Sequence, residues 1–103
     1  WPRWARYVCR HDVARFAQFA VRVMGCRMNY FDPAETAMAG IDALERYFRD
    51  INMPVTLTEM GITLDEAAME RMVDMCSRQG TRTIGQFVKL DKDDMRRIYG
   101  MAR

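Results

Sequence analysis

The 103-residue sequence predicts an all-α fold, and three observations support this class. Apolar residues recur every three or four positions in several segments, which is the period of an amphipathic helix. Residues typical of helix starts and stops flank these segments. No group of segments has the pattern needed to assemble a strand ladder. We therefore expect one domain, residues 1–103, built as a bundle of about five helices.

The first half of the chain carries two well-marked helices. One is expected from about Asp12 to Met24, with Gly25 as its left-handed stop, and residues 1–7 are interpreted as the end of an earlier helix. Its apolar face is Phe16, Phe19, Ala20 and Val23. The second begins at the N-cap Asp32 and continues to Pro54, because a proline disfavours helical geometry at the residue before it. Its apolar stripe is Ala37, Ile41, Leu44, Phe48 and Ile51.

The second half carries three shorter segments. Residues 56–61 have the spacing of a capping box and a final glycine, and are interpreted as a short helical turn. The same spacing at Thr63 and Glu66 is expected to open a fourth helix that closes at Gly80, and the last helix starts at Asp91. The apolar faces are Ala68, Met69, Met72, Val73 and Cys76, followed by Met95, Ile98, Tyr99 and Ala102.

Charge, hydropathy and cysteine spacing exclude several classes of function. The 16 basic and 14 acidic residues leave a formal net charge of +2, too little to indicate a nucleic-acid partner or an anionic membrane surface. The apolar runs are only a few residues long, so no segment would span a bilayer. The cysteines, Cys9, Cys26 and Cys76, lie far apart, which is typical of reduced thiols in a cytoplasmic protein.

The sequence lacks the residues that most catalytic centres need. Its one histidine, His11, lies among charged neighbours and is interpreted as a surface residue, because iron and zinc sites recruit several imidazoles or thiolates. Asp91, Asp93 and Asp94 cluster at a helix start, where capping is favoured over cation binding. No glycine-rich strand-to-helix turn is present. We therefore expect no catalytic, cofactor-binding or metal-binding residue in this chain.

The one long irregular stretch, residues 80–90, is the candidate for a functional surface. It carries two cations, Arg82 and Lys89, which give a weak indication of a phosphate or nucleic-acid contact. Long ordered loops that contain aromatic residues often line clefts. We expect Gln86 and Phe87 to lie at the rim of a cleft.

The motifs occur in a recognisable order. They are PRWARY (2–7), RFAQFAVRVMG (15–25), DPAE (32–35), GIDAL (40–44), FRDINMP (48–54), LTEMGI (57–62), IGQFVKL (84–90) and DMRRIY (94–99). Together they resemble the C-terminal end of the iron-type (group III) alcohol dehydrogenases, particularly the butanol-dehydrogenase subgroup. The sequence departs from that family at Asn52, where glycine is common, and at Met24, where tryptophan is frequent. Both changes are mild, because Asn tolerates the left-handed conformation and Met remains apolar.

The resemblance implies a two-domain parent enzyme. An N-terminal α/β domain would bind NAD or NADP, and a helical C-terminal domain would hold a divalent metal, iron or zinc. The metal would polarise the oxygen of a small alcohol or aldehyde while hydride passes to or from the nicotinamide. The family's metal ligands, an aspartate and histidines, belong upstream of Pro2, so none is transferred to this chain. A cytoplasmic homo-oligomer is also implied, and the start at Trp1 instead of Met fits a fragment.

Two hypotheses for function follow. In the first, the chain is the C-terminal helical part of an NAD(P)-dependent, metal-dependent alcohol dehydrogenase or aldehyde reductase, inactive alone and partnered by the remainder of the parent chain. In the second, it is a free-standing interaction module that docks a protein through a Met-rich groove, which the ten methionines support. We also expect the isolated chain to self-associate through Trp1, Trp4, Tyr7 and the Met face of the fourth helix.

Overall fold

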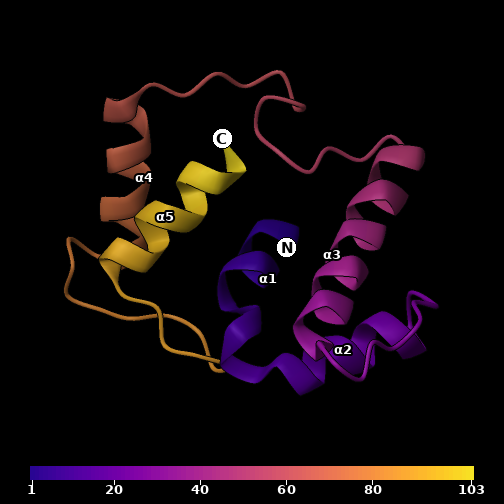
Figure 1. The fold of residues 1–103 in the computed structure, drawn as a ribbon. Helices are drawn as coiled ribbons and strands as arrows, with labels where there is room; N and C mark the ends of the chain where they lie inside the picture. Colours follow the sequence, from indigo (N-terminus) through magenta and orange to yellow (C-terminus); the bar gives the residue numbers. More distant parts are fainter. The chain divides into compact units, whose positions relative to one another are not determined.

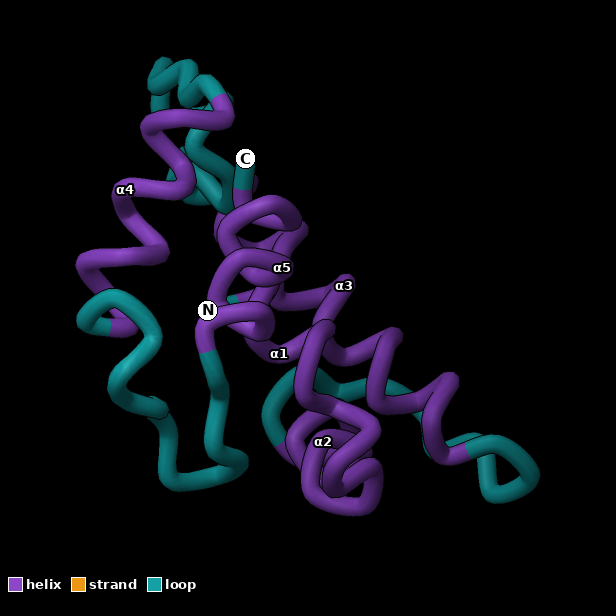
Figure 2. Tube along the Cα trace, turned by 90° about the vertical axis from the view of Figure 1, so that its left-hand side faces the viewer, coloured by secondary structure: helices purple, strands orange, loops and turns teal.

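A computed structural model describes all 103 residues, which form helices joined by loops (Figures 1 and 2). The α-helices are α1 (Pro2–Val8), α2 (Val13–Arg22), α3 (Pro33–Asp50), α4 (Glu66–Ser77) and α5 (Lys92–Ala102), and the 3-10 helix η1 (Cys9–Asp12) joins α1 to α2. The only strand-like pairing is an isolated bridge between Ile84 and Leu90. None of the helices has both the length and the apolar character needed to cross a bilayer. The predicted all-α class is confirmed.

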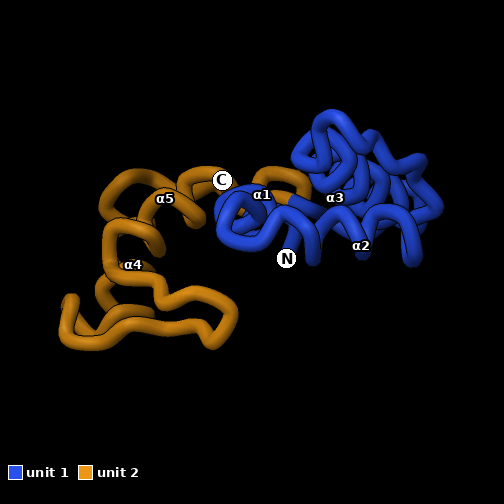
Figure 3. The backbone as a smooth tube through the Cα atoms, turned by 60° about the horizontal axis from the view of Figure 1, so that its bottom comes forward, with its two compact units in different colours: residues 1–55 blue, residues 56–103 orange.

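The chain folds as two compact units (Figure 3). Unit 1, Trp1–Val55, contains α1, η1, α2 and α3, and unit 2, Thr56–Arg103, contains α4 and α5. The segment 1–7, interpreted from sequence as the end of a helix, is a helix with Pro2 in its first turn.

Unit 1 is organised around the packing of α2 on α3. Their backbones approach most closely at Gly40, where a Cβ atom would lie 2.4 Å from the Cβ of Ala20. The buried apolar side chains of the three helices and η1 are Ala5, Val8, Cys9, Phe16, Ala17, Ala20, Ala37 and Ile41. Two residues expected on the apolar faces, Val23 and Ile51, are exposed. Both lie just past the last residue of a helix, where the helical period no longer directs the side chain toward the core.

The start of α3 is as predicted, but its end is not. The Asp32 carboxylate accepts a hydrogen bond from the backbone N–H of Glu35 (3.4 Å), as an N-cap does. The helix ends at Asp50, not at Pro54, because Asn52 adopts a left-handed conformation with φ 61°. The backbone N–H groups of Asn52 and Met53 donate to the last helical carbonyls, the pattern of a Schellman motif. Asparagine therefore performs here the role that glycine usually has.

Both ends of α4 also differ from the prediction. Its N-cap is Asp65, not Thr63, since the Asp65 carboxylate accepts from the backbone N–H of Ala68 (2.6 Å). The helix ends at Ser77, three residues before Gly80, because Arg78 and Gln79 both have positive φ. Residues 56–61 form a hydrogen-bonded turn and not a helix, with a positive φ at the final glycine.

Helix α5 begins as predicted, and unit 2 closes around a small core. Asp91 and Asp94 form a reciprocal capping box with two hydrogen bonds of 2.9 Å. The core side chains are Met69, Val73, Ser77, Leu90 and Met95. Ion pairs join α4 to α5 at the surface, and such pairs usually contribute about 1 kcal/mol or less.

Candidate functional site

The loop between α4 and α5 is closed at its base by the Ile84–Leu90 bridge. The Ile84 N–H donates to the Leu90 carbonyl (3.0 Å), and the Leu90 N–H donates to the Ile84 carbonyl (2.8 Å). Gly85 has φ +99°, and a Cβ there would lie 2.5 Å from the Val88 carbonyl oxygen. Only glycine therefore fits this turn. The bridge projects residues 85–89 as a small closed loop.

The predicted site residues, Gln86 and Phe87, lie in this closed loop. Gln86 is exposed and Phe87 is half-buried. Both lie on the same short loop, and neither lines the hollow of unit 2 formed by Asp74, Met75, Arg78 and Gln79. Gln86 and Phe87 therefore remain a hypothesis, carried into the proposed function below.

Arg82 holds the start of the loop against the end of α4. Its Nε donates to the Cys76 carbonyl (2.9 Å) and its backbone N–H to the Ser77 carbonyl (3.1 Å). The fully buried Ser77 hydroxyl accepts from the backbone N–H of Gly80 (3.0 Å). Because these groups satisfy the last helical carbonyls, Arg82 has a capping role, which argues against its use as a phosphate contact.

The remaining titratable candidates also have local structural partners. His11 is exposed, as predicted, and the carboxylate of neighbouring Asp12 caps α2. Asp91 and Asp94 cap α5, and Asp93 pairs with Arg96 at 2.5 Å. No three His, Cys, Asp or Glu side chains are grouped so that they could hold a metal ion.

The most buried charged group is Glu45 on α3, whose side chain is 7% exposed. Its carboxylate accepts two hydrogen bonds from the Arg6 guanidinium, at 3.0 and 2.9 Å, and Arg6 also pairs with Asp42. The hydrogen bond from Arg6 lowers the pKa of Glu45, against the opposing effect of burial. The bond to Glu45 likewise raises the pKa of Arg6. This pair clamps α1 to α3, and it leaves neither group available for proton transfer near neutral pH.

The three cysteines are free thiols. The buried Cys9 sulfur lies 3.7 Å from the Met38 sulfur. Burial, and then the neighbouring Cys76 side chain, raise the pKa of Tyr99. A phenol with a raised pKa stays protonated at neutral pH, so Tyr99 does not supply a base.

Sequence reasoning missed one feature, a cavity of about 270 Å³ in unit 1. Its walls come from α1, η1, α2 and the first turns of α3. The lining residues are Arg6, Cys9, Arg10, Val13, Ala34, Glu35, Ala37 and Met38. The signal in the sequence was the run of small side chains at Ala34 and Ala37, which leaves room beside a helix.

Comparison with known proteins places these features in a wider context. No family model matches the chain. It is 30% identical over 94 residues to the probable NADH-dependent butanol dehydrogenase 1 of Bacillus subtilis, covering 91% of this chain and 23% of that protein. It is 28% identical over 99 residues to NADH-dependent butanol dehydrogenase A of Clostridium acetobutylicum, covering 95% and 25%.

A solved structure shows the same relationship. The NADH-dependent butanol dehydrogenase A of Thermotoga maritima matches with a TM-score of 0.81 and 27% identity, over 98% of this chain and 26% of that chain. The all-helical chain is thus a segment similar to part of an alcohol dehydrogenase. More narrowly, its resemblance to the butanol dehydrogenases of the iron-type family is confirmed, and it spans about a quarter of the length of these relatives.

Proposed function

We propose that this chain is the C-terminal helical part of an NAD(P)-dependent, metal-dependent alcohol dehydrogenase or aldehyde reductase, and that it completes the catalytic domain. The observation that carries the proposal is the similarity to butanol dehydrogenases along 91–98% of the chain, in sequence and in fold. The names of these relatives specify NADH and butanol. The substrate class of the parent is accordingly a small alcohol or aldehyde.

The residues of this chain do not fit a metal or a dinucleotide. A metal centre of the iron type needs several imidazole and carboxylate donors, and the chain offers one exposed histidine and aspartates already used as helix caps. A dinucleotide site needs a strand followed by a glycine-rich turn, and the chain has no strand. We assign both sites to the remainder of the parent chain. No residue of the present chain is assigned a step of hydride transfer.

The contribution of this chain is structural support. The Arg6–Glu45 clamp and the close packing of Ala20 on Gly40 give unit 1 a fixed geometry on which other helices can pack. In unit 2, the bridged loop presents Gln86 and Phe87, which we place at the rim of the parent's cleft. The parent is proposed to be a cytoplasmic homo-oligomer, and the three free thiols suit a reducing compartment.

The alternative, a free-standing module with a Met-rich groove, gains no support from the geometry. Met69 and Met95 are buried in the core of unit 2, where they fill space between α4 and α5. Met75, on the same helix as Met69, is exposed, so α4 does not present one continuous methionine face.

A chimeric enzyme tests the proposal. The segment of the Thermotoga maritima butanol dehydrogenase that matches this chain would be replaced by residues 1–103, and NADH oxidation with butanal would be measured. We expect measurable turnover, because a fold that matches over 98% of its length should restore the packing. The control chimera carries Ile41→Asp, which places an unpaired charge in the core of unit 1, and should be inactive. If the first chimera folds but has no more activity than the control, the proposal is wrong.

A further inference from the structure

Two sulfur atoms meet inside unit 1. The Cys9 thiol on η1 donates to the Met38 thioether on α3, and the two sulfur atoms lie 3.7 Å apart. The same thiol lies 3.6 Å from the Arg6 carbonyl oxygen. Cys9 is buried and Met38 is half-buried. The fold thus brings together two soft donors for metal ions from positions 29 residues apart in the sequence.

Both sulfur-bearing residues line the unit 1 cavity of about 270 Å³. The rest of its apolar wall is made of short side chains, Val13, Ala34 and Ala37. A cavity needs only about 10–15 Å³ to hold one water molecule, so this one has room for an ion together with water ligands. In a closed core the sulfur contact would be packing alone, whereas here open space adjoins both donors.

The positions of the two donors are fixed before any ion binds. The Cys9 backbone N–H donates to the Ala5 carbonyl at the end of α1. One turn before Cys9, the Arg6–Glu45 clamp joins α1 to α3, the helix that carries Met38. Donors held in this way lose little additional conformational entropy when they bind a ligand.

The separation of the sulfur atoms suits a shared ion. Bonds between a metal and a thiolate are about 2.3 Å long. Two such bonds that span the 3.7 Å between Cys9 and Met38 meet at an angle of about 105–110°. This is close to the tetrahedral angle, so the pair can hold one ion without a movement of η1 or α3. The ion takes the place of the thiol proton.

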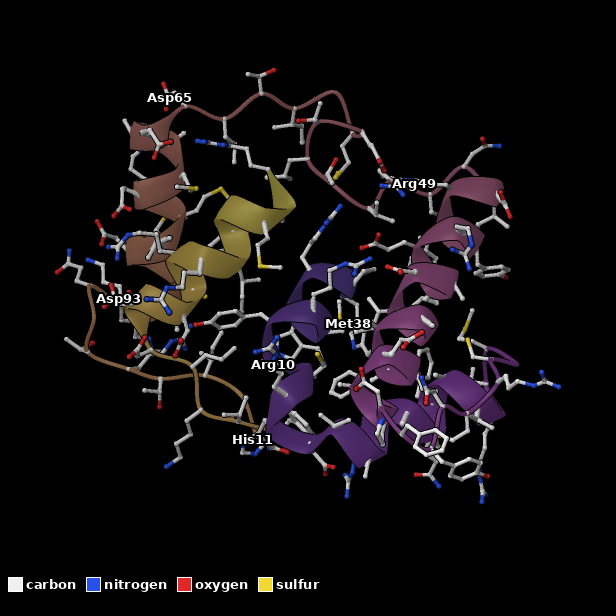
Figure 4. The ribbon with its side chains drawn as sticks, viewed as in Figure 1. Arg10, His11, Met38, Arg49, Asp65 and Asp93 are labelled. Carbon is white, nitrogen blue, oxygen red and sulfur yellow. The ribbon has the colours of Figure 1, made fainter.

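Three charged side chains also line the cavity. Arg6 is already paired with two carboxylates of α3. Glu35 is exposed, and its carboxylate accepts a hydrogen bond from the Asn29 side-chain amide (3.1 Å). Arg10, which is labelled with Met38 in Figure 4, is exposed. The opposite charges of Glu35 and Arg10 offset one another, so the lining without the thiol has no excess negative charge.

Charge and softness together select the ion. The Cys9 thiolate is the one anionic sulfur donor of the cavity. A monovalent cation and one thiolate form a neutral pair, whereas a divalent cation would leave a net positive charge in a largely apolar cavity, which is costly. Thiolate and thioether ligands select Cu(I), while harder divalent ions prefer imidazole, carboxylate and water.

We propose that Cys9 and Met38 form a binding site for Cu(I). On binding, the Cys9 thiol releases its proton to solvent, the thiolate forms a bond to the ion, and the Met38 sulfur donates a lone pair to the same ion. No electron is transferred, so copper stays in the monovalent state. The site is separate from the divalent metal that the proposed function assigns to the remainder of the parent chain, and it does not depend on that function.

Anaerobic titration with Cu(I), in competition with a chromogenic Cu(I) chelator, measures the affinity. Cys26 and Cys76 are replaced by serine in the variants, so that Cys9 is the one remaining thiol. We expect one Cu(I) ion per chain and the release of close to one proton per ion, measured by calorimetry in two buffers of different ionisation enthalpy. X-ray absorption at the copper edge should show two sulfur neighbours at about 2.3 Å.

Three substitutions in this background identify the donors. Cys9→Ser should abolish binding. Met38→Leu removes the thioether at nearly constant volume and should weaken Cu(I) binding at least about tenfold. Met24→Leu, at another half-buried methionine of unit 1, is the matched control and should leave the affinity unchanged. Far-UV circular dichroism confirms that each variant is folded.

A measurement on the unmodified chain does not depend on the folding of any variant. Cu(I) is diamagnetic, so the methyl resonances of the methionines can be followed by NMR as the ion is added. The Met38 methyl resonance should shift with the first equivalent, and that of Met24 should not. A Met38 resonance that does not move overturns the proposal, as does a folded Met38→Leu variant with unchanged affinity or Zn(II) bound as tightly as Cu(I).

Discussion

Replacing Gly40 with alanine should destabilise unit 1, although alanine is the better helix former. The new Cβ would lie 2.4 Å from the Ala20 Cβ and 2.7 Å from the Ala20 Cα, whereas carbon atoms in contact are about 3.5–4.0 Å apart. Because one of these atoms belongs to the backbone, no rotamer change relieves the clash, and α2 and α3 must separate by about 1 Å. Such overpacking costs about 1–3 kcal/mol, while the gain in helix propensity is about 1 kcal/mol. Subtracting this gain from the middle of the overpacking range leaves a net loss of about 1 kcal/mol.

Urea unfolding gives a direct assay for this effect. Both tryptophans of the chain, Trp1 and Trp4, belong to unit 1, so their fluorescence reports its unfolding separately from that of unit 2. With an m value of about 1–2 kcal/mol per M, the midpoint for Gly40→Ala should fall by about 0.5–1 M. The matched control is Gly100→Ala on α5, where a Cβ meets nothing within 4 Å, and it should leave the tryptophan transition of unit 1 unchanged. Equal or increased stability of Gly40→Ala would refute the packing argument.

Three further predictions concern the clamp, the loop and the thiols. Arg6 lowers the pKa of Glu45, so the ionised carboxylate stabilises the fold above its unfolded pKa near 4.5. This stability is lost as the pH falls through the lower folded pKa. The difference in unfolding free energy between wild type and Glu45→Gln should therefore be largest near pH 7 and shrink toward pH 3. In the chimeric enzyme, Gln86→Ala and Phe87→Ala should change KM or kcat for butanal severalfold more than Arg71→Ala on the exposed face of α4, and equal negligible effects would show that the loop is only a connector. Intact-mass analysis without reductant should show Cys9, Cys26 and Cys76 as thiols, and a mass two daltons lower, as one disulfide gives, would contradict this.

Much of the fold was predictable from local chemistry. Asp12, Asp32 and Asp91 have the side chains that N-caps require, and each caps the helix expected to follow it. Helix C-termini were harder to place, because the left-handed residues that end α3 and α4 are Asn52 and Arg78, and arginine gives no such signal in a sequence. Thr63 and Asp65 both suit an N-cap, and the backbone conformation decides between them.

The candidate sites were harder to predict than the helices, because they depend on tertiary contacts. Helical periodicity describes one helix at a time, so it does not predict that the helices form two units. The Arg6–Glu45 clamp joins residues 39 positions apart, and the unit 1 cavity exists only when α1 and α3 meet. By contrast, the closed loop around Gln86 and Phe87 was recognisable as the one irregular stretch, and Gly85 indicated its tight turn. Local signals locate such a loop, but they do not determine what faces it.

Metal content measures the central claim most directly: the chain completes an alcohol dehydrogenase without holding its metal. Residues 1–103 and the Thermotoga maritima chimera would be purified side by side, dialysed against a weak chelator and assayed for iron and zinc by mass spectrometry. We expect the chimera to retain about one metal ion per chain and the isolated chain to retain essentially none, because one exposed histidine and helix-capping aspartates cannot form a first coordination shell. One tightly held ion per isolated chain would contradict the account.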